Sequence, residues 1–371
     1  MSRYSDLEIT FSRRDVRKYV VGFRFNSADD AAEQRSALEP VITIENIGLA
    51  GDDYEAYAER LSAAFFTPDV RGEFNRFRAA AAVLSSILRV RLTIEANAPE
   101  LHAVHWETLR DPNRIDDKAA HLFTGEEIVV SRFLSSGTDW RPIRLKPKAA
   151  LRALVVVANP ASSAKYGLEP IDVEAETALA TKAMTGIHVT RWPSNETVTL
   201  NGLGARLRED FDILYLVCHG KMVDGEPYLF LEEGQPAAGA ELVQAIRELE
   251  HRPRIVVLAS CQSAGSGGVG LAALGPRLAE AGVPAVIAMQ GNVFMTTAAE
   301  FMQSFLQELI VDGQIDRAVA VARGNVRRSA DYWMPVLFLR LRDGCIWYEP
   351  GFGGEGKAEF DKWKAICSSV R

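Results

Sequence analysis

The pattern of apolar and polar positions changes along the chain. In the first 48 residues the two kinds alternate, as in half-buried strands, and helical spacing begins at residue 54. This part is predicted to form strands at residues 7–11, 16–25, 40–45, 90–95 and 128–133 and helices at residues 54–66 and 71–88.

From residue 150 short apolar runs rich in β-branched residues alternate with segments of helical spacing. The expected strands are residues 153–158, 211–218, 228–231, 254–260, 284–289 and 336–341. The expected helices are residues 173–185, 200–209, 239–250, 269–282, 296–311 and 315–329. Strands alternating with helices predict an α/β fold with a mostly parallel sheet flanked by helices on both faces.

Three regions are expected from this pattern. Residues 1–145 are predicted to form a smaller α+β region packed on the main domain, and residues 146–350 the α/β domain itself. The basic, proline-containing stretch at residues 140–148 is typical of an exposed connection between them. Residues 351–371 begin with closely spaced glycines and are predicted to be a tail or linker.

Composition narrows the class of protein. At 371 residues, with 47% hydrophobic and 25% charged side chains, the chain resembles an ordinary globular protein. A formal net charge of −7 argues against direct binding of nucleic acid, and no apolar run is long enough for a membrane. The N-terminus lacks a secretory signal and the four cysteines form no C-x-x-C pair, which favours a reducing, cytoplasmic location.

Two of the expected strands end on chemically useful residues. His219 and Gly220 follow the strand at 211–218, and Cys261 follows the strand at 254–260. Parallel sheets place catalysis just beyond the carboxyl ends of their strands, and the stretch between these two ends has room for one crossover helix. We therefore expect an imidazole and a thiol at the same edge of the sheet.

This pair of residues predicts nucleophilic catalysis. A cysteine attacks well only as the thiolate, so it needs a base beside it. Cys261 is the expected nucleophile and His219 the expected general base. The backbone N–H groups of Gly220 and Cys261 are candidates for an oxyanion hole, whereas Cys218, inside an apolar run, is expected to be inert.

Three further residues are candidates for a substrate groove. Ser260 and Gln262 flank the expected nucleophile. Asp212 begins the strand that leads to His219, and it is either a pocket acid or a turn residue. The loops at residues 221–227 and 262–270 flank the pair and are expected to act as gates.

Two cofactor interpretations compete with this chemistry. Gly265, Gly267 and Gly270 match the spacing of a dinucleotide-binding loop, but the next strand ends without an acidic residue for a ribose. His102 and His105 could form a metal pair, but no third ligand of matching type is evident nearby. Neither a cofactor nor a metal is therefore predicted.

At these strand ends the sequence resembles the CHAT family, relatives of caspases and separases. The main matching motifs are D-I-L-Y-L-V-C-H-G, from Asp212 to Gly220, and V-L-A-S-C-Q-S-A-G, from Val257 to Gly265. Shorter matches are V-H-W-E-T-L-R-D-P from Val104, V-V-A-N-P from Val156, G-V-P-A-V-I-A-M from Gly282 and W-M-P-V-L from Trp333.

The resemblance implies a caspase-like fold and peptide-bond cleavage by a dyad, with His219 as base, Cys261 as nucleophile and Gly220 N–H as an oxyanion donor. It also implies a bacterial defence or signalling system in which the enzyme cuts a dedicated protein and is activated by a partner or sensor domain. Ala259 and Ser260 precede the nucleophile, so no carboxylate lies beside it in sequence. This departure weakens a preference for Arg or Lys before the cut.

The sequence thus predicts a cysteine endopeptidase whose activity is gated. The alternative is a catalytically silent caspase-like scaffold that binds protein partners through the same groove. A scaffold has no need for both His219 and Cys261, and this favours the peptidase.

Overall fold

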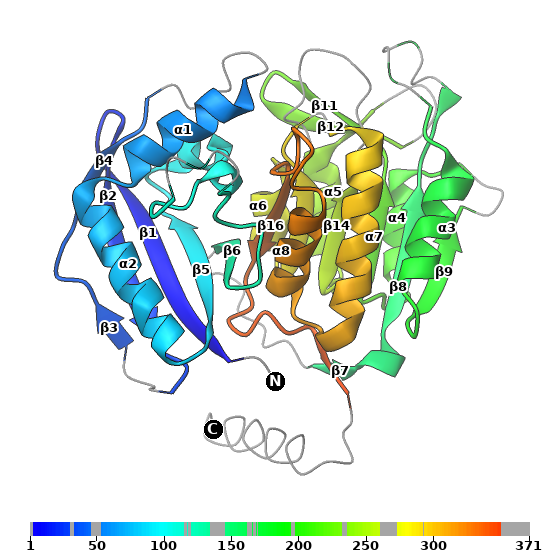
Figure 1. Cartoon of the computed structure of the whole chain (residues 1–371). Helices are drawn as coiled ribbons and strands as arrows, with labels where there is room; N and C mark the ends of the chain where they lie inside the picture. Colours follow the sequence, from blue (N-terminus) through cyan, green and yellow to red (C-terminus); the bar gives the residue numbers. More distant parts are fainter. Residues whose placement is uncertain are drawn as a thin grey trace.

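The fold is taken from a computed structural model of the chain. The structure describes residues 3–29, 33–45, 53–114, 117, 120–133, 145–161, 165, 168, 170–193, 197–231, 236–259, 273–291 and 293–349. Within these ranges twelve strands form a single sheet that runs through the molecule, with helices packed on both faces (Figure 1).

The order of strands in this sheet differs from their order in the chain. Across the sheet lie β3 (Glu33–Arg35), β2 (Lys18–Asn26), β1 (Tyr4–Asp15), β5 (Ile87–Ile94), β6 (Ile128–Phe133), β16 (Pro335–Leu339), β15 (Ala285–Met289), β14 (Ile255–Ala259), β10 (Ile213–Val217), β8 (Arg152–Val157) and β9 (His188–Trp192), with β4 (Val41–Thr43) paired to β2. Strands β9, β8, β10, β14 and β15 are parallel to one another, and β16 is antiparallel to β15. The expected α/β class, with a mostly parallel sheet flanked by helices, is confirmed.

Helices cover the sheet in three groups. Their bounds are α1 (Tyr54–Phe65), α2 (Pro68–Val83), α3 (Val173–Ala183), α4 (Leu200–Leu207), α5 (Gly239–Arg247), α6 (Leu274–Glu280), α7 (Met295–Asp312) and α8 (Ile315–Asn325), with 3-10 turns η1 (Pro99–Ala103), η2 (Trp106–Thr108) and η3 (Lys148–Ala150). Buried side chains of α3, α7 and α8 share one core, those of α4, α5 and α6 a second, and those of α1 and α2 a third under β1, β2 and β5.

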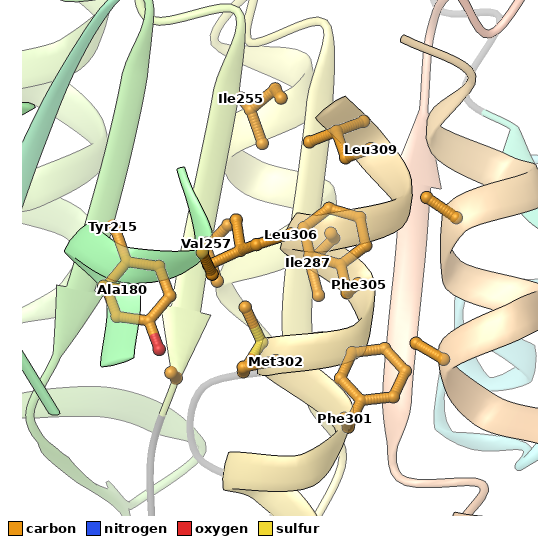
Figure 2. Packing of buried hydrophobic residues seen from close by; sticks show 14 of the residues in the cluster. Ala180, Tyr215, Ile255, Val257, Ile287, Phe301, Met302, Phe305, Leu306 and Leu309 are labelled. Carbon is orange, nitrogen blue, oxygen red and sulfur yellow. The ribbon is translucent and has the colours of Figure 1, made fainter. Parts of the chain in front are cut away.

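Strict alternation along the central strands separates the first two cores. Tyr215 of β10 and Val257 of β14 face α7, while Leu214 and Leu216 face the opposite layer. Figure 2 shows Tyr215, Val257 and Ile287 packed with side chains of α7. Each fully buried aliphatic or aromatic side chain of this kind stabilises the fold by about 1.5–3 kcal/mol relative to exposure.

The structure differs from the prediction in one helix and in one strand of the main sheet. The helix predicted at residues 71–88 is too long, because α2 ends at Val83 and Ser85 adopts a left-handed φ of 51°. Strand β5 then begins at Ile87, and its first apolar residues had continued the helical spacing. Strand β9 was not predicted, since its exposed edge carries polar residues such as His188 and Arg191.

The sheet continues across the expected boundary near residue 145. Strand β6 pairs with β16, which joins the N-terminal strands to those of the main domain. The two parts are also joined by side chains, because the buried Arg89 of β5 donates to the buried Asp316 of α8. The division into residues 1–145, 146–350 and 351–371 stays a prediction, and residues 350–371 lie outside the described ranges.

Two small sheets complete the fold. Strands β11 (His219–Val223), β12 (Glu226–Phe230) and β13 (Ala237–Ala238) form an antiparallel sheet near the carboxyl end of β10. Strands β7 (Lys146–Pro147) and β17 (Trp347–Tyr348) form a short parallel pair. Among the described helices, none combines the length and apolar character that crossing a bilayer requires.

Candidate active site

His219 lies just beyond the carboxyl end of β10 and is the first residue of β11. Only 2% of its surface is exposed. It pairs with Phe230 in the β11–β12 hairpin. The hairpin therefore holds the backbone of His219 in place at the edge of the main sheet (Figure 1).

A two-residue turn closes this hairpin. Asp224 and Gly225 have φ values of 52° and 80°, which is the left-handed geometry that an Asp-Gly hairpin turn requires. The segment at residues 221–227, expected to be a mobile loop, is therefore mostly strand and tight turn. The other expected gate, residues 262–270, lies outside the described residues.

The register of the hairpin determines the direction in which the backbone N–H of Gly220 points. Val223 and Glu226 flank the two-residue turn and so form a hydrogen-bonded pair. Hydrogen-bonded and non-bonded pairs alternate, and Met222 pairs with Pro227, which has no N–H to donate. Gly220 falls at the next non-bonded position, so its N–H points away from β12.

Strands β10 and β14 meet this edge side by side. They are parallel, and Val217 pairs with Ala259. His219 follows Val217 by two residues, and Cys261 follows Ala259 by two residues in the sequence. Ser260, Cys261 and Gln262 lie outside the described residues, so the pairing of His219 with Cys261 stays a prediction.

The neighbouring Cys218 is fully buried in the core shared with α4, α5 and α6. Burial raises the pKa of its thiol to about 12. The thiol therefore stays protonated at neutral pH and is shielded from reagents in water.

Asp212 does not come together with His219. It precedes β10, so it lies at the amino end of the strand that His219 follows. Its carboxylate is 3% exposed and accepts hydrogen bonds from Arg254 Nε at 2.8 Å and the Arg152 backbone N–H at 3.1 Å, with Lys146 Nζ at 2.9 Å. Asp212 was interpreted as a possible residue of the substrate groove. This is corrected, because Asp212 lies at the opposite end of β10 from His219 and its ion pairs hold that end of the sheet together.

A buried polar cluster near the candidate site was missed by sequence reasoning. We call Glu107, Arg132, Gln290 and His105 the Gln290 cluster. Arg132 Nη2 donates to Glu107 Oε2 at 2.7 Å and to Gln290 Oε1 at 2.6 Å. Gln290 Nε2 donates to Glu107 Oε2 at 2.8 Å, and His105 Nδ1 lies 3.1 Å from Gln290 Oε1. Gln290 directly follows buried β15, and this was the same signal that singled out His219.

His105 hydrogen-bonds within this cluster. Burial lowers the pKa of both His102 and His105 to about 4, so both imidazoles are neutral at physiological pH. Within the described ranges, no three His, Cys, Asp or Glu side chains gather as a metal ion would require.

Solved structures of two kinds are similar to this chain. The Arg-specific cysteine proteinase gingipain R is 12% identical, with a TM-score of 0.44 over 80% of this chain and 74% of that chain. Two separase–securin complexes from Saccharomyces cerevisiae are each 13% identical, with TM-scores of 0.40 and 0.42 over 69% and 73% of this chain. The matched regions cover only 15% and 17% of the separase chain, so the present chain spans a small part of the length of separase.

No curated protein sequence matches this chain. The CHAT domain family model matches residues 55–344, which is well over half of the sequence and includes both strand ends described above. The chain therefore belongs to the CHAT domain family.

Proposed function

We propose that this protein is a cysteine endopeptidase in which His219 and Cys261 form a catalytic dyad that cleaves a specific protein partner. Membership of the CHAT domain family supports the proposal, since the family resembles caspases and separases in the two motifs that carry these residues.

The observation that carries the proposal is the matched register of β10 and β14. Alternate residues of both strands face the core covered by α3, α7 and α8, and they are Ile213, Tyr215, Val217, Ile255, Val257 and Ala259. Counting two further residues along each sequence reaches His219 and Cys261. In the sequence, His219 and Cys261 thus have the same offset from Val217 and Ala259, which pair on neighbouring parallel strands.

The proposed reaction uses the dyad in both half-reactions. His219 takes the thiol proton of Cys261, and the thiolate attacks the scissile carbonyl carbon. The N–H groups of Gly220 and Cys261 hold the oxyanion, a contribution of about 3–4 kcal/mol in comparable sites. The carbon–nitrogen bond breaks as His219 protonates the leaving amine, which leaves a thioester. Water, deprotonated by His219, then hydrolyses the thioester to a carboxylic acid and restores the thiol.

The burial of His219 supports a gated enzyme. A base with 2% of its surface exposed is not open to a peptide backbone, so substrate access requires a rearrangement near β11. We propose that an activating partner or sensor domain supplies it. A cytoplasmic bacterial defence or signalling system is the setting that we propose for such an enzyme.

Alkylation by iodoacetamide tests the dyad without needing the natural substrate. We expect Cys261 of the native protein to react fastest among the cysteines, and to keep reacting below the usual thiol pKa of about 8.5, because His219 stabilises the thiolate. His219→Ala should slow Cys261 alone. The measurement is the alkylation rate of each cysteine by peptide mass spectrometry.

The scaffold interpretation makes the opposite forecast. If Cys261 is alkylated at the same rate in the wild type and in His219→Ala, the proposed catalytic dyad is wrong. A second measurement compares new protein N-termini produced in host lysate by the wild type and by Cys261→Ala, with the products of neighbouring genes added.

A further inference from the structure

The side-chain amide of Gln290 uses its full hydrogen-bonding capacity in a buried position. Its Oε1 faces Arg132 Nη2 and His105 Nδ1, at 2.6 and 3.1 Å. Its Nε2 donates to Glu107 Oε2 at 2.8 Å and to the Trp333 carbonyl at 3.2 Å. An amide with two donors and two acceptor positions has no further partner to find.

These contacts connect four separate parts of the chain. Gln290 follows β15, Glu107 lies in η2, Arg132 in β6, and Trp333 just before β16. The backbone N–H of Gln290 also donates to the Met334 carbonyl at 2.8 Å. The carboxyl end of β15 is thus held by residues from the N-terminal part of the chain and by residues just before β16.

The position of Gln290 at the end of β15 connects these contacts to the candidate active site. Strand β15 is the direct neighbour of β14, and Ala288 pairs with Leu258. In the sequence, Cys261 follows Leu258 by only three residues. A displacement of the end of β15 would therefore also displace the end of β14, which leads to the expected nucleophile.

Stability alone does not account for these residues. Glu107 and Arg132 are each 2% exposed at their side chains, and a buried ion pair is often no more stabilising than apolar residues of the same volume. Such groups are better suited to selecting one geometry, because every alternative leaves a buried polar group without a partner.

We propose that Gln290 is a positioning residue of the candidate active site, where its four side-chain contacts fix the end of β15 beside the strand that leads to Cys261. The inference rests on the proposed peptidase function. It assigns Glu107 and Arg132, from the N-terminal part of the chain, to the support of the site.

Two substitutions separate positioning from folding. Gln290→Leu removes all four side-chain contacts, and we expect the His219-dependent alkylation rate of Cys261 to fall about tenfold to a hundredfold at every pH. Gln290→Glu keeps the shape of the side chain and makes its behaviour depend on a proton.

The charged and titratable groups around Gln290 set the direction of that dependence. They are Glu107 from η2, Arg132 from β6 and His105, with Arg323 of α8 acting on Glu107. As a neutral acid, the substituted Glu can donate to Glu107 or to the Trp333 carbonyl, and as a carboxylate it repels both. Arg132 attracts the new carboxylate but already pairs with Glu107, so two carboxylates would share this counter-charge. Burial and the negative charge of Glu107 therefore raise the pKa of the new carboxyl. We expect the rate to approach that of the wild type at about pH 6 and to fall about tenfold below it by about pH 9.

Gln244→Glu is the matched control. Gln244 is exposed on α5 and donates to Glu248 at 2.7 Å, so this change also sets a carboxylate beside a carboxylate. Its rate relative to the wild type should not change with pH. Near-ultraviolet circular dichroism in the same buffers gives the folded fraction, to which every rate is normalised.

The outcomes distinguish the two proposals. If wild-type Cys261 reacts no faster than in His219→Ala, the peptidase function fails and the role of Gln290 fails with it. If the wild type shows the His219-dependent rate and both Gln290 variants match it at all pH values while folded, the positioning role alone is wrong. If Gln290→Leu does not fold, the pH profile of Gln290→Glu decides by itself.

Discussion

Buried charge is the feature that matters most at the scale of single residues. Burial by itself raises the pKa of Glu107, but the charge and hydrogen bonds of Arg132 outweigh this and lower it. The carboxylate is therefore ionised in the folded protein, and Arg132 depends on it as a counter-charge. Removing one member of such a pair costs more than the pair contributes.

We expect Glu107→Gln to lower the free energy of unfolding by about 3–5 kcal/mol at neutral pH, because Arg132 would remain buried without its counter-charge. Urea denaturation measures the loss. Since the folded pKa of Glu107 is lowered, its contribution is present above the unfolded carboxyl pKa and disappears as pH falls through the folded pKa. The difference between the variant and the wild type should therefore shrink in acid.

The control for this change is Glu209→Gln, which removes an exposed ion pair between Glu209, just after α4, and Arg206. A surface pair of this kind contributes about 0–1 kcal/mol. Equal losses at the two positions would contradict the importance assigned to burial at Glu107.

Cys218 gives a second residue-scale prediction. With a buried thiol whose pKa is raised to about 12, it should resist iodoacetamide in the native protein at pH values near 8. It should react fully once the protein is denatured. Native labelling of Cys218 at the rate of a solvent-exposed thiol would show that the core around β10 opens readily.

At the scale of elements, the β11–β12 hairpin does the most for the candidate site, because its first residue is His219. Its turn depends on Gly225, whose φ of 80° disfavours any side chain. A Cβ at this position would meet nothing within 4 Å, so the cost of adding one is conformational and not steric.

We expect Gly225→Ala to destabilise the hairpin by about 1–2 kcal/mol. Hydrogen exchange of the amides of β11 and β12 measures this, and the His219-dependent labelling of Cys261 should fall in parallel. Gly125→Ala is the control, since a Cβ there also meets nothing within 4 Å and its φ is not left-handed. The same exchange rates in both variants would contradict the proposed role of the turn.

Much of the sheet was predictable from the sequence, because β10, β14 and β15 are buried on both faces and appear as short, uninterrupted apolar runs. The position of His219 just after a buried strand was predictable for the same reason, whereas its catalytic role stays a prediction. The Gln290 cluster was not, since Gln290 lies 183 residues from Glu107 and 158 from Arg132, and no local pattern carries contacts of that range. Strand β11 was missed because its burial pattern is that of a small, partly exposed sheet.

At the scale of the whole molecule, the continuous sheet makes the N-terminal strands and the strands of the candidate site mechanically dependent on each other. Besides the pairing of β6 with β16, the buried Arg89 bridges β5 to Asp316 of α8 and donates to Gln314 Oε1 at 3.1 Å. Separate cores on the two sides are thus joined by polar contacts that tolerate little displacement.

We expect Asp316→Asn to lower the stability of both sides together, by about 3 kcal/mol, because it leaves Arg89 short of its main counter-charge. Native-state hydrogen exchange should show the same loss of protection in β5 and in β15. Asp343→Asn, which changes an exposed carboxylate nearby, is the control. Loss of protection in β5 alone would indicate two independently unfolding units, and would favour a structural boundary near residue 145.

Strand β16 has a consequence for biosynthesis. Among the described strands of the sheet it is made last, yet it lies between β6 and β15. A nascent chain that has emerged from the ribosome only to residue 330 holds strands from both flanks but lacks the strand that pairs with both of them. The sheet can close only after Leu339 has emerged from the ribosome, so the N-terminal strands and the strands beside the candidate site are paired into one sheet only late in synthesis.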